Sequence, residues 1–237
     1  MKTAFLDLVF SRSCEGCGCA LGAEEEGALC GDCRSRLQVV RLPFCERCGD
    51  PVSGAFTSSF ECAWCRRVHP AFDWARSAVR YQGVVRTCLR SFKYQAGFWL
   101  LADVEQWLTA LWRTCPASVQ TADWVTSVPL YPRRERERGY NQASVLAARL
   151  AKKVGIPFRD RVLWRWRPTA TQTRLTAAQR AHNVKGVFAV PRPRRVEGAR
   201  VVLVDDVMTT GATVNECARV LKAAGAASVM VLSAARG

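Results

Sequence analysis

Eight cysteines, arranged as four C-x-x-C pairs within residues 14–65, constrain this 237-residue chain more than any other feature. A C-x-x-C turn presents two thiolates along one edge of a tetrahedron, so two such turns supply the four sulfurs that Zn²⁺ prefers. Within each of two successive quartets, 12 or 13 residues separate the pairs, which suits a zinc ribbon. The predicted zinc ligands are Cys14, Cys17, Cys30 and Cys33 for the first ion and Cys45, Cys48, Cys62 and Cys65 for the second.

Two other arrangements use the same cysteines. A cross-brace would interleave the four pairs around the two ions, and the spacing leaves that pairing open. A disulfide framework is typical of secreted chains, but the opening stretch MKTAFLDLVFSRSCEGC carries Asp7 inside its apolar run and lacks a small-residue cleavage site. Because four sulfurs leave zinc no open coordination position, we expect two structural zinc sites and no catalytic metal among these cysteines.

The net charge indicates which class of ligand or partner the chain can bind. Lysine and arginine number 35 against 20 aspartate and glutamate residues, which gives a formal net charge of +15. Eight thiolates around two Zn²⁺ ions would lower this charge to about +11. A chain this basic favours phosphates as ligands, on a nucleic acid, a nucleotide or a sugar. No run of 18 apolar residues occurs, so we expect a cytoplasmic protein without membrane insertion.

Residues 201–237 follow the order strand, loop, helix and strand that is typical of a parallel α/β sheet. The apolar run VVLV is followed by Asp205 and Asp206, whose carboxylates can accept hydrogen bonds from a pair of ribose hydroxyls. The hydroxyl-rich loop after them begins a helix, where backbone N–H groups favour an anion. A solvated acidic turn followed by an N-cap threonine is the alternative interpretation. The predicted phosphate-binding residues are Thr209, Thr210, Gly211, Ala212 and Thr213.

A second charged loop, PLYPRRERERGYNQ, follows the strand-like run WVTSV at residues 124–128. Its arginines offer planar, paired donors for diphosphate oxygens. A solvated charge run is the alternative, but open α/β sheets bind ligands beyond the carboxyl ends of their strands, which favours the ligand role. The candidate residues are Pro129, Leu130, Arg133, Arg134, Arg136 and Arg138, with Lys93 as a further phosphate contact.

These motifs occur together in one known family. The stretch VVLVDDVMTTGAT resembles the ribosyl-diphosphate-binding motif of type I phosphoribosyltransferases. With the C-x-x-C pairs, YQG at 81–83, FKY at 92–94 and RERGYNQA at 136–143, nearly the whole chain is similar to the ComF family. That family's QTxL...R..N segment is matched by Gln172, Leu175, Arg180 and Asn183, with Arg174 where glycine is common.

The resemblance implies a double zinc-ribbon module over residues 1–68, followed by a type I phosphoribosyltransferase-like α/β domain over residues 69–237, built on a parallel sheet flanked by helices. It implies that 5-phosphoribosyl diphosphate binds with Mg²⁺, that the catalytic acids Asp205 and Asp206 orient the ribose, and that residues 209–213 hold the 5′-phosphate. It also implies a phosphoribosyltransferase reaction, with the acceptor left open, and a role in DNA uptake during natural competence.

Two further hypotheses keep the same fold without turnover. In the first, the chain is an adaptor for single-stranded DNA and DNA-uptake proteins, and Trp164 and Trp166, interleaved with Arg165 and Arg167, stack on bases. Packing of these tryptophans in the core or at an interface is the alternative interpretation. In the second, the chain is a zinc-tethered sensor that binds the ribosyl diphosphate.

Overall fold

The computed structural model describes residues 12–22, 24–52, 60–169, 179 and 183–237. The segment that resembles the ComF pattern therefore falls largely outside the described residues, with Gln172, Arg174, Leu175 and Arg180 beyond them and Asn183 within them. Among the described residues, no helix combines the length and apolar character that a membrane span requires.

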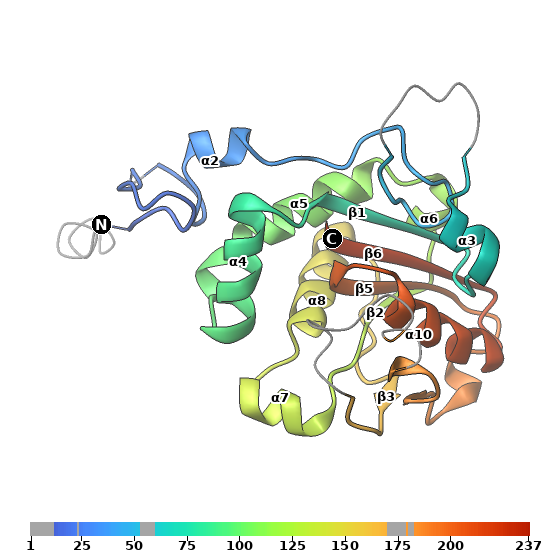
Figure 1. The fold of residues 1–237 in the computed structure, drawn as a ribbon. Coiled ribbons are helices and arrows are strands. Elements are labelled where there is room, and N and C mark those ends of the chain that lie inside the picture. The colour runs from blue at the N-terminus through green and yellow to red at the C-terminus, as the bar shows by residue number, and fades with distance from the viewer. Residues whose placement is uncertain (1–11, 23, 53–59, 170–178, 180–182) are drawn as a thin grey trace.

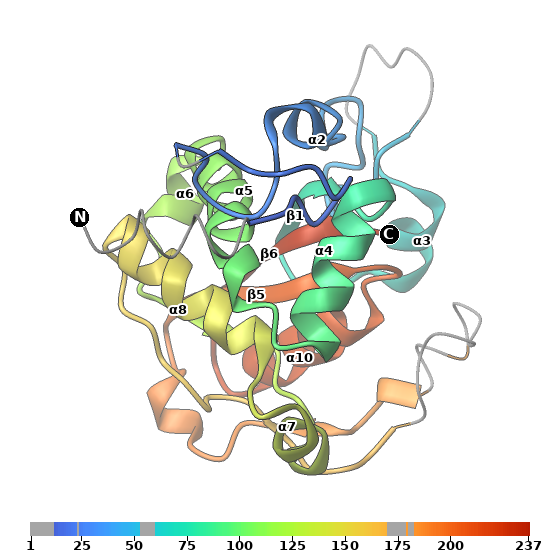
Figure 2. The ribbon, with the colours of Figure 1, turned by 90° about the vertical axis from the view of Figure 1, so that its left-hand side faces the viewer.

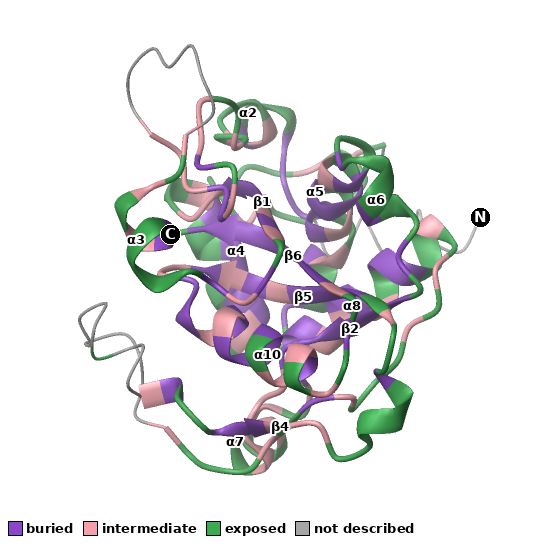
Figure 3. Ribbon diagram, turned by 90° about the vertical axis from the view of Figure 1, so that its right-hand side faces the viewer, coloured by how far each residue is buried: buried purple, intermediate pink, exposed green. Residues whose placement is uncertain are grey.

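A four-stranded parallel sheet forms the centre of the molecule (Figure 1). Its strands, in the spatial order β1-β6-β5-β2, are β1 (Trp74–Arg80), β6 (Ser228–Arg236), β5 (Arg200–Met208) and β2 (Trp124–Ser127). The two central strands are apolar along most of their length because both faces of the sheet are covered, as Figure 3 shows by their burial. Pairing of β5 with β6 continues to Met208 and Arg236, so their carboxyl ends lie side by side.

Helices cover both faces of the sheet. On one face, α5 (Leu101–Arg113) contacts β1 and β6, and α8 (Gln142–Val154) contacts β5 and β2. On the other face, α10 (Ala212–Ala223) packs against β5, β6 and a small two-stranded antiparallel sheet of β3 (Trp164–Arg165) and β4 (Phe188–Ala189). This parallel sheet with helices on both faces confirms the α/β fold class predicted from the sequence.

Shorter elements connect these layers. After β1 comes α4 (Gly83–Tyr94), which stands at the carboxyl ends of the strands, the end toward which Figure 2 looks. The remaining described elements are α2 (Gly31–Ser35), α3 (Ala63–Val68), η1 (Phe98–Leu100), α6 (Ala117–Gln120), α7 (Pro132–Arg138) and η3 (Pro193–Arg195).

The two cysteine quartets pack in different places. Cys14, Cys30 and Cys33 join the hydrophobic cluster formed with α4 and α5. Cys45, Cys48 and Cys65 join the cluster on the α10 face of the sheet. Between the quartets, the chain runs along the outer edge of β1, where Arg80 N–H donates to the Gln38 carbonyl and Val40 N–H to the Ala78 carbonyl. This pairing covers an edge that would otherwise expose unpaired backbone groups.

A buried carboxylate anchors the first quartet to the domain. Asp103 on α5 is 1% exposed, accepts a hydrogen bond of 2.7 Å from Ala28 N–H, and forms an ion pair of 3.1 Å with Arg34 on α2. Because a buried carboxylate is costly without partners, these contacts make the position of the first zinc ribbon depend on α5.

Candidate functional site

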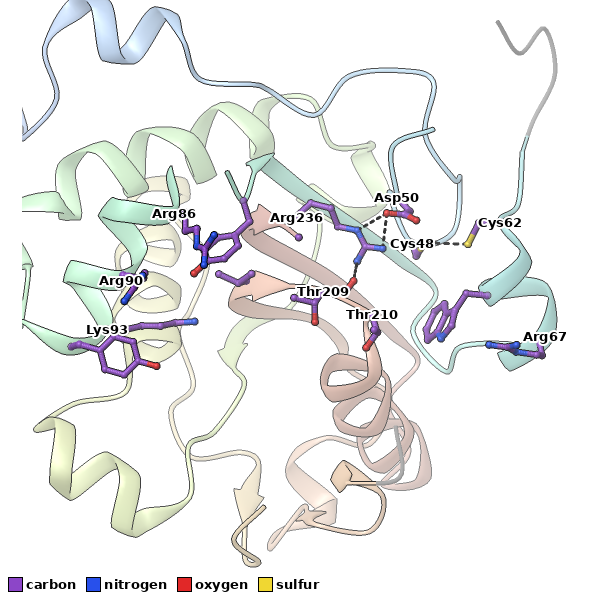
Figure 4. Close-up of a pocket in the computed structure, with 15 residues that line it drawn as sticks. Cys48, Asp50, Cys62, Arg67, Arg86, Arg90, Lys93, Thr209, Thr210 and Arg236 are labelled. Carbon is purple, nitrogen blue, oxygen red and sulfur yellow. Dashed lines mark hydrogen bonds and ion pairs between the residues drawn. The ribbon is translucent and has the colours of Figure 1, made fainter. Parts of the chain in front are cut away.

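A cleft of about 1130 Å³ opens at the carboxyl ends of β5 and β6 (Figure 4). Its lining comes from the end of β5 with the loop after it, from Tyr81 and helix α4, from the last two residues of the chain, and from the turns of the second cysteine quartet with α3. Five of its side chains are cationic and one is acidic, so the cleft suits an anionic ligand. The charged residues are Arg67, Arg86, Arg90, Lys93, Arg236 and Asp50.

The predicted phosphate loop lies at this cleft. Thr209 and Thr210 line it, and Gly211 is the N-cap of the 12-residue helix α10. Gly211 has a φ of 78°, and a Cβ atom there would lie 2.9 Å from Met208 Cε, so the turn requires glycine. Ala212 and Thr213 begin the helix itself, where the N–H groups of the first turn have no intrahelical partners. The loop thus has the geometry that favours an anion at a helix N-terminus.

The two acids at the end of β5 differ in environment. Asp206 is buried, and its Oδ2 lies 2.5 Å from Lys93 Nζ on α4. Burial raises the pKa of Asp206, but the adjacent Lys93 ammonium outweighs burial and holds that pKa below its usual range. Asp205 accepts a hydrogen bond of 2.9 Å from Asp206 N–H, and burial together with the Asp206 charge raises the pKa of Asp205 well above its usual range.

The two side chains start from opposite faces of β5, as those of consecutive strand residues do, but their carboxyl groups interact. The interaction lowers the pKa of Asp206 and raises the pKa of Asp205. Asp206 points toward α4, where Lys93 lies between it and the cleft. Asp205 lies on the α10 side, near Cys217 of that helix. Burial raises the pKa of Cys217, and the charge of Asp205 raises it further. In this conformation Lys93 lines the cleft, whereas Asp206 is buried and does not line it.

The charged loop after β2 is a helix, α7, which Gly139 ends at a φ of 85°. Arg133 and Glu137 form an exposed ion pair of 2.8 Å along it. Pro129, Leu130 and Arg136 line a separate cleft of about 490 Å³ beyond the carboxyl end of β2. Arg138 approaches the larger cleft, because its guanidinium lies 5.4 Å from the ring centroid of Tyr94 and Tyr94 lines that cleft. The structure does not bring the other predicted arginines to the Thr209 loop.

Several lining residues are absent from the candidates predicted from the sequence. Arg86 and Arg90 share one face of α4 with Lys93, at positions i, i+4 and i+7. That spacing is visible in the sequence and could have placed them beside Lys93. Arg236 and Asp50 carry no comparable signal, because strand pairing and the ribbon turn bring them together from positions 186 residues apart.

The structure gathers the paired cysteines into the two sequential quartets. In each quartet, Sγ atoms lie within 4.8 Å of one another. The distance between neighbouring sulfurs, such as 3.7 Å between Cys48 Sγ and Cys62 Sγ, is far longer than a disulfide bond of about 2.05 Å. Backbone N–H groups of Cys30 and Cys62 donate to Cys14 Sγ and Cys45 Sγ at 3.3 Å, as expected for thiolates. Four converging sulfurs fit tetrahedral Zn²⁺.

The two tryptophans at β3, Trp164 in the strand and Trp166 just after it, are not core residues. Trp164 and Trp166 are each 46% exposed, and the Arg167 guanidinium lies 4.2 Å from the ring centroid of Trp166. Trp164 lines the smaller cleft with α7. The interpretation that the two indoles pack in the core is therefore wrong, and packing at an interface stays a prediction.

Two family models agree with this architecture. The family model described as a double zinc ribbon domain matches residues 5–69, and the phosphoribosyl transferase domain model matches residues 140–236. The structure of glutamine phosphoribosylpyrophosphate amidotransferase from B. subtilis is 26% identical, with a TM-score of 0.39 over 56% of this chain and 26% of that one.

Three curated proteins match most of the chain. Competence protein F of Haemophilus influenzae is 30% identical, over 96% of this chain and 98% of that protein. DNA utilization protein YhgH of Salmonella typhimurium is 33% identical, over 86% and 88%. Competence protein ComFC of Bacillus subtilis is 26% identical, over 84% and 80%. With a parallel sheet behind a double zinc ribbon and this similarity along nearly its full length, the chain belongs to the family of competence protein F and the DNA utilization protein YhgH.

Proposed function

We propose that this chain binds 5-phosphoribosyl diphosphate in the large cleft, with the 5′-phosphate at residues 209–213. The observation that carries the proposal is the hydroxyl-rich loop at the N-terminus of α10, which opens onto a strongly cationic cleft at the carboxyl ends of parallel strands. The match to the phosphoribosyl transferase domain over this part of the chain supports the same ligand.

The charged groups beside the loop would bind the ribose and the diphosphate of the ligand. Asp205 and Asp206 would accept hydrogen bonds from the ribose hydroxyls, and Lys93 would leave Asp206 for a phosphate oxygen. Mg²⁺ bound to the diphosphate would supply charge neutralisation for that leaving group, in keeping with its preference for carboxylate and phosphate oxygens. The arginines of α7 would reach the diphosphate by movement about Gly139, which has the conformational freedom to act as a hinge.

If the bound diphosphate is turned over, the reaction is a phosphoribosyl transfer. The bond from ribose C1 to the diphosphate oxygen breaks, diphosphate leaves with the electron pair, and an acceptor atom bonds to C1 and gives up its proton. Cations placed where the leaving group gains charge would lower the barrier. The sensor hypothesis differs in one measurable respect, because a sensor binds the ligand without releasing diphosphate.

Calorimetry of the zinc-loaded chain tests whether the proposed ligand binds. We expect 5-phosphoribosyl diphosphate to bind with Mg²⁺, and Asp205→Asn combined with Asp206→Asn to abolish that binding. The matched control is Asp123→Asn, which changes an exposed acid at the opposite end of β5 and should bind as the native chain does. A folded native chain that binds no ribosyl diphosphate would contradict the proposal. Release of diphosphate in the presence of candidate acceptors then separates an enzyme from a sensor.

A second candidate function, binding of single-stranded DNA, is favoured by the aromatic side chains of the same cleft. Trp64, Tyr81 and Tyr94 lie among its cations, and proteins hold single strands by stacking bases on aromatic rings between phosphate-binding cations. The names of the relatives, DNA utilization protein and competence protein, support DNA as a partner and a role in DNA uptake.

The salt dependence of oligonucleotide affinity locates this surface. Each phosphate contact to a single strand contributes about 0.7 to the slope of log affinity against log salt, so Arg86→Gln with Arg90→Gln should reduce the slope by about 1.4. The matched variant, Arg165→Gln with Arg167→Gln, should leave the slope unchanged. The opposite pattern would place the DNA-binding surface at β3. No change in either variant would exclude both surfaces as the DNA-binding site.

A further inference from the structure

We propose that the second zinc ribbon holds the Thr209 loop in its ligand-binding conformation through an Asp50–Arg236 contact, which makes Arg236 a positioning residue. The proposal rests on the proposed function for what the loop binds. The coupling itself is a property of the fold, and it is tested below without a ligand.

Arg236 bridges the ribbon and the loop (Figure 4). It is the last residue of β6 and is 6% exposed. Its Nε donates to Asp50 Oδ1 at 3.0 Å, and its Nη2 lies 2.9 Å from the same oxygen. On the other side, its Nη1 donates to the carbonyl oxygen of Thr209. The planar guanidinium thus connects a carboxylate of the ribbon to the backbone of the loop.

The bonded carbonyl belongs to the first residue of the loop. A phosphate loop must direct backbone N–H groups at its anion, and a carbonyl oxygen turned toward that anion would repel it. Because Arg236 holds the Thr209 carbonyl, the peptide that starts the loop is fixed before any ligand arrives. Such a fixed peptide binds an anion without the entropy cost of ordering the loop.

The position of Asp50 is set by the ribbon turn itself. Cys45 N–H donates to the Asp50 carbonyl at 2.8 Å, and Gly49 N–H donates to the Cys45 carbonyl at 2.8 Å. Gly49 has a φ of 66°, and a Cβ atom there would lie 2.7 Å from the Ala75 carbonyl oxygen of β1. The turn that presents two zinc thiolates therefore also places the Asp50 carboxylate.

A second contact from the same ribbon reaches the loop. Trp64 lies on α3 between Cys62 and Cys65, and it stacks on Phe72 with ring centroids 6.4 Å apart. A Cβ atom built on Gly211 would lie 3.3 Å from the Trp64 ring, so this indole covers the N-cap of α10. Two parts of the second ribbon thus act on the two ends of the three-residue loop, Trp64 beside Gly211 and Asp50 through Arg236 at Thr209.

Four variants of the zinc-loaded, full-length chain test the coupling. They are Asp50→Asn, Arg236→Met, both together, and the conservative Arg236→Lys. Asp50 is 43% exposed, so its substitution by asparagine should leave the fold and the zinc content intact, and zinc analysis checks this. The control pair is Asp123→Asn with Arg200→Met, which removes an Asp–Arg ion pair of 2.9 Å at the opposite end of β5.

The first readout is hydrogen exchange of the backbone amides of residues 207–213. Loss of a charged hydrogen bond should accelerate this exchange about tenfold in either single variant. The double variant should be no faster than the faster single variant, because both substitutions break one contact. Arg236→Lys should be intermediate, since it keeps the charge and loses the planar fork. The control pair should exchange as the native chain does.

The second readout is calorimetric affinity for 5-phosphoribosyl diphosphate with Mg²⁺, which should fall about tenfold in Asp50→Asn if the loop must be ordered on binding. Native exchange in Asp50→Asn overturns the proposal, and if Arg236→Met then still weakens binding, Arg236 touches the ligand directly. If exchange is faster in the variants but the native chain binds no ribosyl diphosphate, the coupling stands and the proposed function is refuted instead.

Discussion

The buried Lys93–Asp206 ion pair predicts how much stability is lost when Lys93 is replaced, and in which direction that loss changes with pH. Lys93→Met leaves the Asp206 carboxylate, 3% exposed, without its cation. Removing one partner of a buried pair costs about 3–5 kcal/mol, and because the Lys93 side chain is 20% exposed we expect the lower end, about 3 kcal/mol. The matched control is Lys222→Met, which breaks the more exposed Lys222–Asp73 pair and should cost at most about 1 kcal/mol.

The pH dependence separates this cause from a loss of packing. In the native chain the pKa of Asp206 lies below its unfolded value, so its contribution to stability is present above the unfolded pKa and is lost as pH falls through the folded pKa. Without Lys93, burial is opposed only by hydrogen bonds from Asp205 and from the Val207 backbone, and we expect the folded pKa of Asp206 to rise above the unfolded value. The variant then loses stability as pH rises through that raised pKa, and acidification restores up to about 1.4 kcal/mol per pH unit.

Guanidinium unfolding of both variants with zinc present, at pH 7.5 and pH 5.5, measures these effects. Relative to the native chain, Lys93→Met should recover up to about 2.7 kcal/mol between the two pH values, whereas Lys222→Met should show no such recovery. The reasoning is refuted if Lys93→Met costs no more than Lys222→Met at pH 7.5. It is also refuted if the cost is the same at both pH values, because a pH-independent loss would come from packing.

Three further predictions follow from particular contacts. Gly211→Ala forces a side chain into a left-handed N-cap with a φ of 78°, so it should lower the free energy of unfolding by at least about 1 kcal/mol in denaturant titration. Cys65→Ser should leave one zinc ion per chain by metal analysis, since its quartet loses a ligand while the other is intact; full loss of zinc would argue against independent quartets. Asp103→Asn should speed release of zinc from the first ribbon to a colorimetric chelator, because it removes the buried ion pair with Arg34; Glu105→Gln, at a more exposed ion pair on the same helix, should not.

Much of the candidate site could be predicted from the sequence because its signals are local. A C-x-x-C turn presents two thiolates whatever surrounds it, and a strand followed by acids, threonines and glycine specifies a turn into a helix N-terminus. The basic face of α4 is also local, since Arg86, Arg90 and Lys93 recur at helical spacing. These patterns indicated the fold class, the zinc ligands and the phosphate loop.

Tertiary structure alone decided which of these groups meet. The order β1-β6-β5-β2 brings α4, which follows β1, to the end of β5, so that Lys93 pairs with Asp206. The same pairing sets Arg236 beside the Thr209 loop and against Asp50, while α7 carries Arg136 to a neighbouring cleft. The amino-acid sequence by itself determined the local chemistry, because turns, caps and periodicity depend on near neighbours. Distant contacts depend on which strands lie side by side, and that is settled by burial of the whole sheet.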